Sequence, residues 1–82
     1  METINKCKKI LELYSEEIKH KNNYWEIKGL NSSKQKWEIL LDKLLKNKRI
    51  TRFEDRLIRS LDFVIKRMED FRDNDFKVIK GN

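Results

Sequence analysis

The chain has 82 residues, a formal net charge of +6, 41% charged residues, one Cys, two Gly and no Pro. A single cysteine excludes an intrachain disulfide, and a chain of this length forms one domain with only a modest core. With so little Pro and Gly to interrupt helices, long helices with short connections are expected.

The first predicted helix begins near Thr3. Its apolar residues recur at spacings of three and four: Ile4, Cys7, Leu11, Tyr14 and Ile18. This spacing indicates one buried helix face. We favour a helix that runs to Lys28 and ends at Gly29, where a residue without Cβ can adopt the left-handed conformation. The alternative is a helix that ends near His20, with residues 21–23 as a loop.

The second predicted helix begins at residues 31–33, where Ser32 and Gln35 have the spacing of a capping box. Its apolar face consists of Trp37, Leu40, Leu41, Leu44 and Leu45, and its outward basic residues are Lys36, Lys43 and Lys46. We expect it to end near Asn47, whose side chain tolerates a left-handed cap. A short basic connection, residues 48–50, follows.

The third predicted helix runs from near Arg52 to Arg72. Thr51 and Glu54 have the spacing of a capping box, in which a hydroxyl and a carboxylate satisfy free amides of the first turn. The apolar seam of this helix consists of Leu57, Leu61, Val64, Met68 and Phe71. A seam of this length needs a partner, which must be the N-terminal half of the chain or a second copy.

Together these elements predict an all-α fold, an antiparallel up-down-up three-helix bundle with long first and third helices. Residues 1–72 would form the single domain, and residues 73–82 a C-terminal tail that is either frayed or a short docking strand. Because the second helix is the shortest, the other two would project beyond it. Apolar surface around Tyr14, Met68 and Phe71 would then remain for another molecule, and dimerisation is one way to cover it.

Residues that could carry catalysis or bind a metal are few. Cys7 and His20 are the strong soft ligands of the chain, whereas a closed zinc site normally uses four. On one helix they would be about 20 Å apart, too far for a nucleophile and its base. Like-charged pairs such as Glu12 and Glu16 are common on solvated helix faces, and two isolated Gly residues cannot form a phosphate loop. We therefore predict a non-enzymatic protein without metal or cofactor.

Nearly all the excess positive charge lies in the middle of the chain. Residues 29–52 carry seven basic and two acidic side chains, so they account for +5 of the net charge of +6. The residues predicted to bind a partner are Lys36, Lys43, Lys46, Lys48, Arg49, Arg52 and, as an aromatic anchor, Trp25. Such a set suits an acidic protein surface, or nucleic-acid phosphates bound in a salt-dependent way. Plain solvation of a bundle loop is the remaining interpretation.

Part of this region resembles a known family. Residues 44–48, leading through Thr51 to Leu57, Ile58 and Leu61, are similar to the last helical hairpin of the small bacteriocin immunity proteins. The resemblance covers about a quarter of the chain. It implies a cytoplasmic helical bundle that protects a producing cell by engaging a membrane receptor complex, although the family pattern has four helices and three are expected here.

The function that these observations favour is a small protein-binding module of the inhibitor, adaptor or immunity type, presenting a basic helical face to another protein. The alternative is a nucleic-acid-binding accessory protein that uses residues 34–52 without sequence specificity. No apolar run approaches the roughly 18 residues of a membrane span, which predicts a cytoplasmic protein without membrane insertion. Abundant Lys, Asn and Ile are typical of AT-rich genomes, such as those of low-GC bacteria and their phages.

Overall fold

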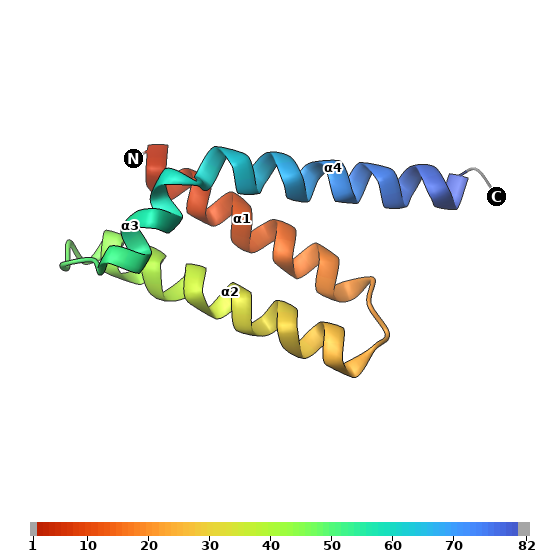
Figure 1. Ribbon diagram of the computed structural model, residues 1–82, viewed down its shortest axis with the longest axis horizontal. Helices are drawn as coiled ribbons and strands as arrows, with labels where there is room; N and C mark the ends of the chain where they lie inside the picture. Colours follow the sequence, from red (N-terminus) through yellow and green to blue (C-terminus); the bar gives the residue numbers. More distant parts are fainter. Residues whose placement is uncertain (1, 81–82) are drawn as a thin grey trace.

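The computed structural model describes the backbone of residues 2–80 and the side chains of residues 2–73. Within residues 2–80 there are four helices: α1 (Glu2–Lys19), α2 (Tyr24–Leu45), α3 (Arg52–Arg59) and α4 (Leu61–Lys80) (Figure 1). The all-α class predicted from the sequence is confirmed. The prediction of three helices is wrong, because the expected third helix is divided at Ser60.

The first helix is shorter than the favoured prediction. α1 ends at Lys19, so the alternative end near His20 is the correct one. Asn23 sets the boundary, because its Oδ1 accepts hydrogen bonds from the N–H groups of Trp25 (2.8 Å) and Glu26 (3.3 Å). An Asn in this position satisfies free amides at the start of a new helix. These two hydrogen bonds outweigh the apolar seam of the first helix, which could continue beyond Ile18 only if Lys21 took the next seam position.

The favoured start of the second helix is also wrong. Gly29 does not cap a helix, and Ser32 with Gln35 does not begin one, because all three lie inside the 22-residue α2. Gly29 is therefore an interior helix residue. A Cβ atom added to it would meet nothing within 4 Å.

The end of α2 follows the local sequence closely. The helix stops at Leu45, and Asn47 has a φ of 55°, the left-handed conformation predicted for it. The N–H of Lys48 donates to the carbonyl of Lys43 (2.8 Å), and the N–H of Asn47 donates to the carbonyl of Leu44 (3.3 Å). This pair of bonds is a Schellman motif, which satisfies carbonyls that have no partner inside the helix.

The stretch expected to form one helix from residue 52 to residue 72 forms α3 and part of α4. Its predicted start is confirmed: the Oγ1 of Thr51 accepts from the N–H of Glu54 (3.1 Å), and the Oε1 of Glu54 accepts from the N–H of Thr51 (2.7 Å). The chain turns at Ser60, whose hydroxyl donates to the carbonyl of Leu57 (3.0 Å). A hydroxyl bonded to a nearby carbonyl competes with regular helix structure. The turn lets α3 cross one end of the molecule.

The three long helices run in alternating directions, and α1 packs against both α2 and α4 (Figure 1). The molecule is thin, with extents of 48 × 25 × 17 Å. Its core lies toward the α3 end and consists of Cys7, Ile10, Trp37, Leu40 and Leu61. Because the core uses the first half of α1 and the second half of α2, it leaves the end near the α1–α2 connection less filled.

The predicted boundary between a domain and a tail, at residue 73, falls within α4, which continues to Lys80. The side chains of Phe76, Val78 and Ile79 lie outside the described residues, as do residues 81 and 82. Across residues 2–80, no helix has both the length and the apolar character needed to span a bilayer.

Candidate partner-binding surfaces

The seven residues predicted to bind a partner do not form one surface. Six lie on the second half of α2, in the connection that follows it, or at the start of α3. Trp25 lies in the first turn of α2, about 30 Å from Lys46 at 1.5 Å per residue. The predicted set therefore belongs to two surfaces at opposite ends of the molecule.

Two of the predicted lysines are paired within the chain. The Nζ of Lys43 lies 2.8 Å from the Oε1 of Glu54, a residue that is only 5% exposed, and the Nζ of Lys46 lies 3.2 Å from the Oδ1 of Asp42. The hydrogen bond from Lys43, helped by the N–H of Thr51, lowers the pKa of the Glu54 carboxyl. Lys43 thus holds α2 to α3, whereas Lys46 remains exposed beside its neighbour on the same helix face.

The other predicted basic residues at this end are exposed and make no ion pair with a described carboxylate. Lys48 and Arg49 lie in the α2–α3 connection, and Arg52 is the first residue of α3. Arg56, which the sequence analysis did not select, lies one turn further along α3 and is also exposed. Four unpaired cations within nine positions create a positive field that favours an anionic partner.

An exposed aromatic residue, Phe53, lies among these cations. It is 51% exposed, and the Nζ of Lys36 lies 5.6 Å from its ring centroid, within the range of a cation–π interaction. Phe53 is not part of the predicted seam, which begins four residues later at Leu57, and no role was predicted for it. The signal that could have found it is its place directly after Arg52. We call Lys48, Arg49, Arg52, Phe53 and Arg56 the basic cluster.

The second surface is an apolar groove of about 560 Å³, lined by all three long helices. Its apolar lining residues are Tyr14, Trp25, Leu30, Phe63, Val64, Met68 and Phe71, its polar ones are Glu17, Lys21, Glu26, Ser33 and Arg67, and Gly29 also lines it. The sequence predicted open apolar surface around Tyr14, Met68 and Phe71, and all three line this groove. The sequence analysis attributed this open surface to a short second helix. That explanation is wrong, because α2 is the longest of the four described helices.

Aromatic side chains stand well out of the groove into solvent. Trp25 is 72% exposed; the ring of Tyr24 meets it edge-on at 5.2 Å between centroids, and the Nζ of Lys28 lies 5.4 Å from its centroid. Phe63 and Phe71 of α4 are also more than half exposed. Exposed apolar patches of this kind mark interaction surfaces in folded proteins.

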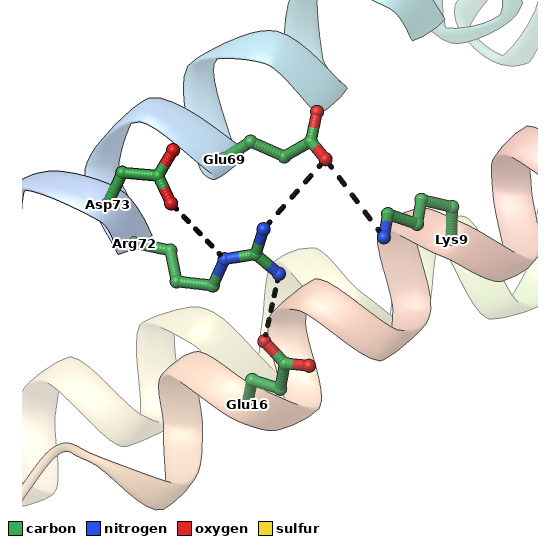
Figure 2. A network of polar contacts seen from close by, with 5 residues as sticks. All are labelled: Lys9, Glu16, Glu69, Arg72 and Asp73. Atoms are coloured by element: carbon green, nitrogen blue, oxygen red, sulfur yellow. Dashed lines mark hydrogen bonds and ion pairs between the residues drawn. The ribbon is translucent and has the colours of Figure 1, made fainter. Parts of the chain in front are cut away.

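Apolar packing of Leu61, Val64 and Met68 against the core holds α4 in place, and exposed ion pairs to α1 add to it. The pairs between the two helices are Lys6–Asp62 (2.6 Å), Lys9–Glu69 (4.0 Å) and Glu16–Arg72 (3.4 Å). Figure 2 shows Arg72 reaching from α4 to Glu16 on α1 while it also meets Glu69 and Asp73. At helical spacing Asp62 and Glu69 lie on a different side of α4 from Val64, Met68 and Phe71, whereas Arg72 lies one turn after Met68. The position of α4 is therefore set by α1, and the groove does not have to close for α4 to stay in place.

The described residues hold no cluster of three or more His, Cys, Asp or Glu side chains placed to bind a metal ion. Cys7 has no exposed surface, and its burial raises the pKa of its thiol. A thiol in this setting acts as a small apolar core group.

Comparison of the chain with protein-family models, with curated proteins and with solved structures finds no match. The resemblance to bacteriocin immunity proteins therefore stays a prediction.

Proposed function

We propose that this chain is a small protein-binding module that docks its basic cluster onto an acidic surface of another protein. The observation that supports this most directly is the exposure of Lys48, Arg49, Arg52 and Arg56 without carboxylate partners among the described residues. By contrast, the basic residues between α1 and α4 use acidic residues of the same chain. The basic cluster concentrates four exposed cations within nine positions of the chain.

The residue types of the basic cluster, and the rigid connection that carries several of them, suit protein recognition. Arginine and aromatic residues dominate the energy of many protein interfaces, and a guanidinium can bind a carboxylate with two parallel hydrogen bonds. The Schellman motif, the capping box and the Lys43–Glu54 pair all brace the α2–α3 connection. A braced connection loses less conformational entropy on binding than a free loop. The activity would be binding alone, as in an inhibitor, an adaptor or an immunity protein.

A second function is favoured by Phe53. An exposed ring that directly follows Arg52 and lies 5.6 Å from the Nζ of Lys36 offers a base-stacking surface beside phosphate-binding cations, which is the combination that single-stranded nucleic acids require. Binding of this kind would not depend on sequence and would weaken steeply with salt.

Two charge-matched variants test the proposal. Lys48→Glu with Arg49→Glu changes the basic cluster, and Lys19→Glu with Lys66→Glu changes exposed lysines elsewhere; each variant has a formal net charge of +2, four less than the wild-type +6. Helicity measured by circular dichroism should be the same in both. In affinity capture from a nuclease-treated lysate of a low-GC bacterium, we expect one set of proteins to bind wild type and the control variant but not the cluster variant.

Equal capture by the cluster variant and wild type would refute docking through this surface. Fluorescence anisotropy with generic single-stranded and duplex DNA decides between the two functions. DNA binding that falls steeply with salt, together with capture of proteins from an untreated lysate but of none from the nuclease-treated one, would replace the first function by the second.

A further inference from the structure

The apolar groove is a continuation of the hydrophobic core. On α1, Tyr14 lies one turn after the fully buried Ile10, and on α4 Met68 lies two turns after the buried Leu61. Leu30 of α2 contributes to the same groove. The helix faces that meet around the core at the α3 end thus continue toward the α1–α2 connection, where nothing in the described chain covers them.

The charges around the groove do not select a strongly charged partner. Lys21 and Glu26 lie on its edge and pair with each other at 3.9 Å. Glu17 and Arg67 remain, one of each sign, with no described ion-pair partner. A surface that carries one free charge of each sign is complementary to a copy of itself turned by a twofold axis, because each acid can then meet the base of the other copy.

The distribution of charge over the whole chain agrees with this. Residues 61–80, which form α4, carry five basic and five acidic side chains, whereas the excess positive charge lies in residues 29–52. The basic cluster lies in the α2–α3 connection and on α3, whereas the groove is lined by α1, α2, α4 and the α1–α2 connection. Two copies that met antiparallel through α4 would keep their basic clusters apart and exposed.

The exposed apolar area of the groove is large enough to contribute about half of a stable interface. Trp25, Phe63 and Phe71, which line the groove, are between 56% and 72% exposed. At roughly 200 Å² for a fully buried aromatic side chain, they leave about 380 Å² per copy available for burial. Specific interfaces bury about 800 Å² per partner, and the half-buried residues of the groove would supply much of the rest.

We infer that a second copy of this chain covers the groove, in a twofold dimer held together by the aromatic residues of α4 and by Trp25. Phe63 and Phe71 of each copy enter the groove of the other, and Arg67 of one copy faces Glu17 of the other. The inference does not depend on the proposed function, because the basic cluster takes no part in this contact.

Molar mass in solution tests the inference directly. By sedimentation equilibrium or light scattering, the wild-type mass should rise with concentration from 10.1 kDa to twice that value. Phe63→Ser with Phe71→Ser should raise the dimer dissociation constant at least about 100-fold, since interface aromatics commonly act as hot spots. The control is Ile39→Ser with Leu45→Ser, which removes two residues that are equally exposed but lie outside the groove, and it should dimerise like wild type.

Tryptophan fluorescence gives a second readout. Trp37 is buried in the core and Trp25 is exposed, so concentration-dependent protection from iodide quenching would report the burial of Trp25. A wild-type chain that stays monomeric up to about 0.5 mM would overturn the inference and leave the groove to a helix of another protein. A dimer that survives the two Phe substitutions with Trp25 still open to iodide would overturn it as well.

Discussion

Glu54 offers the sharpest test of how the α2–α3 connection is held. Its carboxylate accepts from the N–H of Thr51 at 2.7 Å and from the Nζ of Lys43 at 2.8 Å, and the residue is nearly buried. Glu54→Gln keeps a group that can complete the capping box but removes the charge opposite Lys43. Glu54→Ala removes both interactions. The two substitutions therefore separate the cap from the ion pair.

The expected losses follow from the geometry. A partly buried hydrogen bond between charged groups contributes about 1.5–3 kcal/mol, but the Lys43 side chain is 27% exposed and can turn to water, so we expect Glu54→Gln to cost about 1–1.5 kcal/mol. Loss of the cap adds about 1 kcal/mol, which brings Glu54→Ala to about 2–3 kcal/mol. In a chain of this size that lowers the unfolding temperature by roughly 10–20 °C.

Urea unfolding followed by circular dichroism measures these differences, with Glu38→Gln on the exposed side of α2 as the control. In a Lys43→Met background, Glu54→Gln should cost about 1 kcal/mol less than in wild type, because its ionic partner is already gone. If Glu54→Gln is as harmless as Glu38→Gln, or costs the same with and without Lys43, the ion pair does not stabilise the connection and the reasoning fails.

Low pH should abolish the stabilisation that the Lys43–Glu54 ion pair provides. Lys43 and the N–H of Thr51 lower the pKa of the folded Glu54 carboxyl below its ordinary value of 4.5. The stabilisation is therefore complete above about pH 4.5 and is lost as the pH falls through the lower, folded-state pKa. The stability gap between wild type and Glu54→Gln should be full at pH 7 and should shrink below pH 4.5. A gap that does not change between pH 7 and pH 3 would contradict the lowered pKa.

Two backbone substitutions test the helix assignments by thermal unfolding. Gly29→Ala should stabilise the protein by about 0.5–1 kcal/mol, because Gly29 is inside α2 and an added Cβ meets nothing within 4 Å; a loss of stability would argue against a continuous helix there. Asn47→Ala should cost about 1 kcal/mol and Asn47→Gly should cost nothing, because the φ of Asn47 is 55°; equal effects of Ala and Gly would argue against the left-handed cap.

The features that the sequence determined by itself depend on interactions between residues close together in the chain. Thr51 and Glu54 bond to each other across three residues, and Asn47 adopts a left-handed conformation that its own side chain tolerates. The first helix boundary was also encoded locally, by Asn23. A glycine at position 29 favours a longer first helix, but Asn23 stands before two amides that need an acceptor and starts the next helix instead.

The division of α3 from α4 and the separation of the two surfaces were decided only by the tertiary structure. The apolar seam continues from Leu57 to Leu61 without a break, so nothing in the spacing required a turn at Ser60. The turn lets α3 cross the end of the molecule and bring Glu54 to Lys43, while α4 lies along α1. Whether a basic residue pairs with a carboxylate or faces solvent depends on how α3 crosses the other helices. Ion pairs between residues distant in sequence exist only once the helices are packed.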